Sequence, residues 1–180
     1  MKKIMTIVLF SIIMASSCLF AVTDELGFYI RWKHLVSGTE VLSILNYAGD
    51  APLENNTKDV DSIEERQNLA MVRLTTNIGG FNTFSFRATA LQTQDRSSAV
   101  TYTLYIDRDG MVSSLQIGND PGSTYPLPGM PTVATSFTVP NGISTPRAYD
   151  ILLSAELTGY DQMKPGDLYS SVITIERVAN

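Results

Sequence analysis

Residues 99–107, AVTYTLYID, alternate apolar and polar side chains with a period of two. Val100, Tyr102, Leu104 and Ile106 fall on one phase, which is the pattern of a half-buried β-strand. The same alternation recurs along the chain at 28–33, 41–46, 70–76, 84–90, 133–139 and 149–157. The segment 168–178 is rich in β-branched residues and is predicted to be the closing strand.

Turn-forming residues separate these runs. They are Gly79-Gly80, Asp109-Gly110, 119–122, 126–131, 140–142 and Pro165-Gly166. This pattern predicts an all-β fold, an antiparallel sandwich of about eight strands that forms one domain over residues 22–180. The polar stretch 54–68 is predicted to be a loop. The residues expected to line the core between two sheets are Trp32, Phe86, Tyr102, Leu104, Ile151 and Leu153.

The N-terminus has the plan of a secretory signal peptide, which we assign to residues 1–21. A basic start at 1–3 precedes the uncharged run 4–15 and a small-residue zone that ends at Ala21. Cleavage after Ala21 would leave a mature chain that begins at Val22 and is exported to the periplasm or the cell surface. Two alternatives stay open: lipidation of Cys18 after cleavage behind 15–17, and a retained membrane anchor.

Composition excludes several classes of function. The 180 residues carry a formal net charge of −5 and a sequence pI near 4.8, which disfavours binding to nucleic acid. A membrane is expected as a partner only if Cys18 is lipidated. With one Cys and one His, the chain lacks the ligands of a disulfide framework or a Cys/His zinc site, and we predict no metal or cofactor.

Three groups of polar residues are candidates for chemistry. Residues 107–110, Asp-Arg-Asp-Gly, resemble part of a calcium loop but lack its remaining ligands, so we predict a hairpin turn in which Gly110 takes the positive φ that a bulged turn requires. His34 has no Cys or second His to join it, and no catalytic role is assigned to it. The densest acidic group is predicted to be a solvated loop rather than an acid–base pair, and consists of Asp59, Asp61, Glu64 and Glu65.

Two tyrosines fall in segments predicted to be loops, Tyr125 and Tyr160. Exposed tyrosines can stack on a sugar ring or pack on a protein partner. They are therefore the candidate contacts to a ligand, a glycan or a partner.

Two motifs resemble the spore coat protein U family. Residues 99–107 are similar to its L-x-Y-x-L-Y-x-D strand, and residues 164–175, KPGDLYSSVITI, to its closing P-x-G-x-Y-x-D-x-V-x-V-x-V strand. The resemblance covers about residues 98–178 and implies an immunoglobulin-like sandwich related to pilins of the chaperone–usher route. The chain departs from the family pattern in its shortage of cysteines, in the two residues between Gly166 and Tyr169 where one is usual, and in Ser171 in place of Asp. Its C-terminal tail also lacks the penultimate aromatic residue of pilin subunits.

The closing strand offers two modes of assembly. It can complete its own sandwich or pair with a neighbouring subunit by β-augmentation, through a segment that contains Tyr169, Val172, Ile173 and Ile175. We expect a complete sandwich whose edge is guarded by Glu176 and Arg177.

These observations predict an exported, non-enzymatic protein that acts in adhesion or assembly through strand edges or loops. The first alternative is a secreted module that binds a carbohydrate or another ligand. The second alternative is a small exported hydrolase, which would require a buried carboxylate pair in a cleft.

Overall fold

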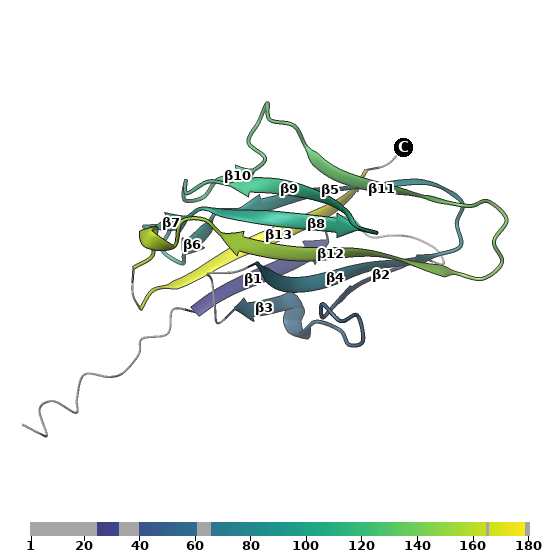
Figure 1. The fold of residues 1–180 in the computed structure, drawn as a ribbon, viewed down its shortest axis with the longest axis horizontal. Helices are drawn as coiled ribbons and strands as arrows, with labels where there is room; N and C mark the ends of the chain where they lie inside the picture. Colours follow the sequence, from purple (N-terminus) through teal and green to yellow (C-terminus); the bar gives the residue numbers. More distant parts are fainter. Residues whose placement is uncertain (1–24, 33–39, 61–65, 165, 179–180) are drawn as a thin grey trace, which may run out of the picture.

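The computed structural model describes residues 25–32, 40–60, 66–164 and 166–178, which form an all-β sandwich of two sheets (Figure 1). The predictions for the segment 1–21, Cys18 and His34 lie outside these residues, as do those for Asp61, Glu64 and Glu65. The backbones of Trp32 and Tyr160 are described, but their side chains are not. No helix in the described part of the chain is long and apolar enough to cross a membrane.

The larger sheet, sheet A, has eight strands and follows the order β10–β5–β13–β1–β3, with β11 on β5 and β6 between β13 and β7. Its strands are β1 (Glu25–Trp32), β3 (Thr57–Val60), β5 (Gly80–Thr89), β6 (Leu91–Thr93), β7 (Ala99–Val100), β10 (Thr124–Tyr125), β11 (Val133–Val139) and β13 (Leu168–Val178). The smaller sheet, sheet B, has five strands in the order β2–β4–β12–β8–β9. They are β2 (Val41–Leu45), β4 (Gln67–Thr76), β8 (Tyr102–Arg108), β9 (Met111–Ile117) and β12 (Arg147–Leu157).

The predicted closing strand is confirmed as β13, and it lies inside sheet A. It pairs with β1 on one side and with β5 and β6 on the other. Its core-facing residues, among them Tyr169, Ile173 and Ile175, are at most 1% exposed, whereas Val172 lies on the other phase and is half-buried. Glu176 and Arg177 lie opposite Ser85 and Phe84 of β5, and the described pairing with β1 ends one residue earlier, at Ile175. The expectation that these two residues guard an edge therefore stays a prediction.

The pairing of β1 with β13 is parallel, although the two strands come from opposite ends of the chain. All other pairings between the described strands are antiparallel, as predicted. The predicted loop at 54–68 is partly wrong. Thr57–Val60 forms β3, which pairs with Leu26–Tyr29 of β1 and buries Val60, while Asp59 on the same strand is exposed.

The hairpin prediction at residues 107–110 is confirmed. The last residue pair between strands β8 and β9 is Arg108 with Met111, so the turn consists of Asp109 and Gly110. Both residues have positive φ, 53° and 81°, as a two-residue type I′ turn requires, so the positive φ of Gly110 is confirmed and the bulge expected at this turn is not present. The Asp107 carboxylate accepts a hydrogen bond from the Gly110 N–H at 2.9 Å, so it stabilises the turn.

One hydrophobic core fills the space between the sheets. Five of the predicted core side chains are buried there, each at most 2% exposed: Phe86, Tyr102, Leu104, Ile151 and Leu153. The Tyr102 hydroxyl crosses the core to the Ser171 hydroxyl on β13 at 2.7 Å, and its ring packs edge-on against Phe28 of β1. Tyr102 therefore joins sheet B to sheet A through both a polar and an apolar contact.

An ion pair between a buried carboxylate and a half-buried arginine closes one end of the sandwich. Glu40, directly before β2, binds the Arg177 guanidinium at 2.5 Å and accepts a hydrogen bond from the Thr76 hydroxyl of β4 at 3.1 Å. Arg177 also donates to the Asn82 side chain on β5. The network links both sheets at this end.

Candidate functional site

The edge of sheet A beside β5 is interrupted by a loop. Strands β10 and β11 both pair with β5, with Tyr125 opposite Ala88 and Val133 opposite Phe86. The intervening residues 126–132 leave the sheet and form the peak between β10 and β11 at the top of Figure 1. On the side of β5 away from β13, Arg87 therefore lies beside the base of this loop and has no strand residue opposite it.

A pocket of about 590 Å³ lies at this interruption. It is lined by Arg87, Ser123, Thr124, Pro126, Leu127, Pro128, Gly129, Met130 and Thr132. The residues around this space thus include one arginine, three residues that carry a hydroxyl group and several aliphatic residues. Pockets of about 300–1,000 Å³ with an apolar lining and a few polar groups are typical of small-ligand sites.

Two Pro-Gly turns hold the loop in shape. Residues 127–130 close with a hydrogen bond of 3.0 Å from the Met130 N–H to the Leu127 carbonyl, and Gly129 has φ of 87°. Residues 120–123 close in the same way at 3.1 Å, with Gly122 at φ of 83°. Proline at the second position and glycine at the third is the sequence of a type II turn, so the chain on both sides of β10 is preorganised.

Arg87 is the charged group of the pocket. Strand alternation directs it to the outer face of sheet A, in one row with Thr174 of β13 and Arg31 of β1. The Arg31 Nε donates to the Thr174 hydroxyl at 3.0 Å, whereas Arg87 forms no hydrogen bond or ion pair with any residue of the described ranges. Its guanidinium is exposed and free to bind a ligand.

Tyr125 adjoins the pocket but does not line it, so its predicted role as an exposed contact is wrong. It belongs to strand β10, its ring is 5% exposed, and its hydroxyl donates to Asp120 at 3.4 Å. Burial first, and then the negative charge of Asp120, raise the pKa of Tyr125 above its usual value. The ring fixes the base of the loop from inside. For Tyr160 the structure describes only the backbone, in a short 3-10 turn at 160–162.

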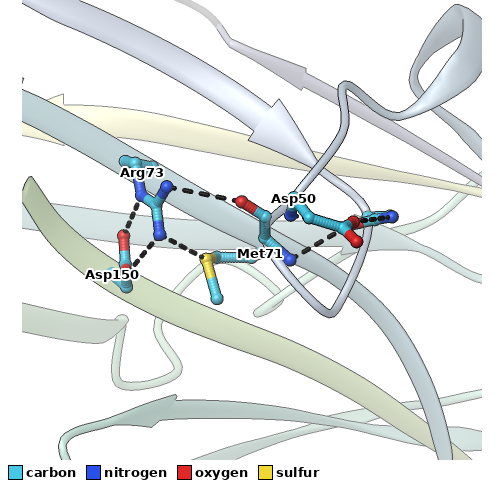
Figure 2. A network of polar contacts seen from close by, with 6 residues as sticks. Asp50, Met71, Arg73 and Asp150 are labelled. Carbon is cyan, nitrogen blue, oxygen red and sulfur yellow. Dashed lines mark hydrogen bonds and ion pairs between the residues drawn. The ribbon is translucent and has the colours of Figure 1, made fainter.

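Two other polar clusters make structural contacts, and the first surrounds Arg73. Figure 2 shows Arg73 of β4 between Asp150 of β12 and the turn that carries Asp50. Its Nε and Nη2 atoms bind the two Asp150 oxygens at 2.7 and 2.8 Å, and Nη1 donates to the Gly49 carbonyl at 3.4 Å. The Asn46 amide oxygen accepts from the N–H groups of Gly49 and Asp50, which closes the turn.

A second polar cluster lies on the outer face of sheet B. The Arg66 guanidinium stacks over the Tyr105 ring at 4.2 Å, and the Tyr105 hydroxyl donates to Glu156 at 2.7 Å. That hydrogen bond is the main cause of a raised pKa for Tyr105. Arg66 also donates to the Ser154 hydroxyl at 2.6 Å, so its charge is already engaged.

Carboxylates in the described ranges do not gather into a metal site, since no group of three or more His, Cys, Asp or Glu side chains lies close enough there. Asp95, for example, accepts hydrogen bonds from Thr93 and Ser97, and these lower its pKa to about 2. It therefore stabilises the turn between β6 and β7.

Arg87 was not singled out by the sequence. It stands on the outward phase of the predicted strand 84–90, where a charged side chain is ordinary. The sequence did mark 126–131 as a turn region, but its meeting with Arg87 depends on the pairing of β10 and β11 with β5. Comparison of the sequence with models of known protein families and with curated proteins gives no match.

Proposed function

We propose that this chain is an exported, non-enzymatic protein of the cell surface or periplasm that acts in adhesion or assembly by binding a partner through its surface. The observation that carries the proposal is the pocket at the interrupted edge of sheet A. Arg87 is unpaired there with respect to the described residues, and the surrounding loop is held by two tight turns. An unpaired charge in a preorganised pocket favours the binding of an external ligand.

The polar contacts support binding over turnover. A hydrolase would require an acid and a base with separate environments in one cleft. Glu40, which is 8% exposed, has its two oxygens bound by Arg177 and Thr76. Asp150 is likewise held by Arg73. These two carboxylates therefore stabilise the fold. The residues that line the pocket include no carboxylate.

The position of β13 supports a role that does not depend on strand donation. Donor-strand polymerisation requires a groove that a partner's strand completes. Here β13 is paired on both sides within its own chain. We therefore propose assembly through side chains and loops of a complete sandwich, in line with the resemblance to coat and pilin-like proteins but without exchange of the closing strand.

The same pocket favours a second function, that of a secreted carbohydrate- or ligand-binding module. Tyr125 cannot stack on a sugar ring at the surface, because its own ring is buried. The polar and aliphatic lining of the pocket takes its place as the candidate contact surface. Adhesion and ligand binding would then use the same pocket. In adhesion the ligand is attached to a cell or another surface, whereas in simple ligand binding it is free in solution.

Genetic complementation tests the proposal. Deletion of the gene should lower attachment of the producing cells to surfaces or to one another, and the wild-type gene should restore it. The pocket variant Arg87→Gln/Met130→Asp should be exported in equal amount and fail to restore attachment. The matched variant Arg147→Gln/Met111→Asp replaces an exposed arginine and an exposed methionine outside the pocket lining, and it should restore attachment.

Full restoration by the pocket variant would refute a role for the pocket in attachment. Unchanged attachment after deletion would refute adhesion and assembly as the function.

A further inference from the structure

The charge of the pocket defines the ligand group that it can hold. Arg87 is the one charged residue in the lining. Its planar guanidinium presents parallel N–H donors that match a carboxylate in a bidentate arrangement. A phosphate monoester carries about −1.5 to −2 charges at neutral pH and is better matched by a cluster of cations. A single unpaired arginine therefore favours a monovalent carboxylate.

The walls of the pocket define the rest of the ligand. Ser123, Thr124 and Thr132 offer hydroxyl groups that both donate and accept hydrogen bonds. Pro126, Pro128 and Met130 offer aliphatic surface to C–H groups. A ligand that fits both needs hydroxyl groups and C–H faces on one compact body, which is the surface of a sugar ring. The absence of aromatic side chains from this lining disfavours a flat, fully apolar ligand.

We infer that the pocket binds an acidic sugar residue, with the carboxylate on the Arg87 guanidinium and the ring between the hydroxyl groups of 123–124 and Thr132 and the aliphatic wall of the β10–β11 loop. A volume of about 590 Å³ lies in the range of small-ligand sites and has room for a sugar residue together with its neighbours in a polysaccharide. This inference rests on the proposed function and specifies its ligand as a uronic acid in a polysaccharide.

The preorganised loop supports this assignment. The turns at 120–123 and 127–130 fix the backbone on both sides of β10, and the Tyr125 ring fixes β10 from the core. Little ordering is then required when a ligand binds, which favours recognition of one sugar residue at a time. The geometry of the hydroxyl groups relative to Arg87 is set by the register of Thr124 opposite Thr89, two residues from Arg87 on β5.

Calorimetry with the purified mature protein tests the inference. The probes are trisaccharides of galacturonate, glucuronate and mannuronate, their methyl esters, and an acetylated tripeptide with a free C-terminus. At least one uronate should bind, and its methyl ester, which has lost the charge but not the ring, should bind at least about 10-fold more weakly. Arg87→Gln should weaken uronate binding by about 10- to 100-fold.

The matched control is Arg31→Gln, which removes the same charge from the same face of sheet A but outside the pocket lining. It should change uronate affinity by less than about 2-fold, as expected for a group that makes no contact with the ligand. Unchanged melting temperatures of both variants would show that the fold is intact, which is expected because both side chains are exposed.

Three results would overturn the inference: no binding of any uronate at millimolar concentration, equal binding of a uronate and its methyl ester, or binding of the peptide alone. Failure of the sugar assignment is distinguishable from failure of the proposed function. If no uronate binds but the pocket variant still fails to restore attachment, the pocket functions with another ligand. If no uronate binds and the pocket variant restores attachment, both proposals fail.

Discussion

Glu40 and Arg177 form an ion pair of 2.5 Å that joins the segment before β2 to the end of β13, and the Glu40 side chain is only 3% exposed. Thr76 and Asn82 complete the network from β4 and β5. Both sheets thus meet in one polar contact at this end of the sandwich. A second ion pair, Arg73–Asp150, lies on the outer face of sheet B with side chains 31% and 35% exposed.

The two ion pairs should differ in their effect on stability. Arg177→Ala leaves the Glu40 carboxylate buried with the Thr76 hydroxyl as its one remaining partner among the described residues, and it should lower the free energy of unfolding by about 3–5 kcal/mol. Arg73→Ala breaks a pair that solvent already screens, and it should cost about 1 kcal/mol or less. Urea unfolding of both variants measures the difference. Equal losses would contradict the structural role assigned to the buried pair.

The core between the sheets should be sensitive to cavities. Leu104→Ala or Leu153→Ala removes a side chain that is 0% exposed and should cost about 2–5 kcal/mol. Val112→Ala, on β9 where the side chain is 50% exposed, is the control and should change the unfolding midpoint little. A midpoint that is the same for Leu104→Ala and for wild type would place this residue outside the core.

Gly118 should be intolerant of a side chain because Tyr125 fills the space beside it. A Cβ atom there would lie 2.4 Å from the Tyr125 hydroxyl oxygen and 3.0 Å from Cζ. Gly118→Ala should therefore destabilise the protein by about 1–3 kcal/mol. Removal of the hydroxyl in Gly118→Ala/Tyr125→Phe should recover part of this loss, and thermal melting of the single and double variants measures it. Additive losses would show that the two residues do not compete for this space.

The stability should fall in alkaline solution because of Tyr102. Burial raises the pKa of its hydroxyl well above the usual value of about 10, although the hydrogen bond with Ser171 opposes the shift. Above pH 10 the unfolded chain therefore releases this proton before the folded protein does. Stabilisation by the neutral hydroxyl is complete below pH 10 and is lost as the pH rises toward the folded pKa.

Tyr102→Phe is the variant that tests this pH dependence. It should be less stable than wild type at neutral pH because two partners of the hydroxyl, Ser171 and the Thr89 carbonyl, lose their contact. The difference between the two proteins should shrink from pH 7 to pH 11. Urea unfolding at both values measures it, and a difference that stays constant or grows would show that Tyr102 does not cause the alkaline loss.

Much of the fold could be predicted from the sequence because its long strands bury one face. Phe84, Phe86 and Ala88 occupy the apolar positions of the alternating pattern, and all three are buried on β5. The same holds for Ile151 and Leu153 on β12. Period-two alternation reports this geometry directly. The turn at Asp109-Gly110 was also predictable, because a two-residue I′ hairpin requires residues that tolerate positive φ.

Short and exposed strands could not be predicted. Strands β3, β6, β7 and β10 have only two to four residues each, too few for alternation to be recognised. Strand β9 begins with the exposed residues Met111 and Val112 and carries Ser113 and Ser114, as an edge strand does, so its pattern is weak. The parallel pairing of β1 with β13 depends on contacts between the chain ends, which no local pattern reports.

The candidate site could not be predicted either, because it also depends on how strands distant in the sequence pair. Tyr125 lies between two turn sequences and was therefore expected in a loop, but β10 pairs with β5 and directs the ring into the core. In the sequence, Arg87 is an ordinary charged residue on the outward phase of a strand. Only the interruption of the sheet edge at 126–132 places a pocket beside it. Both outcomes depend on the register of non-local strands.

The most direct test is the mass and unfolding of residues 22–180 purified without a chaperone, since the proposals for the protein's surface require β13 to be held by strands of its own chain. We expect a monomer with one cooperative unfolding transition, unchanged by a peptide of alternating apolar residues. Aggregation of the purified protein, relieved by such a peptide, would contradict a complete sandwich and indicate a subunit that needs a donated strand.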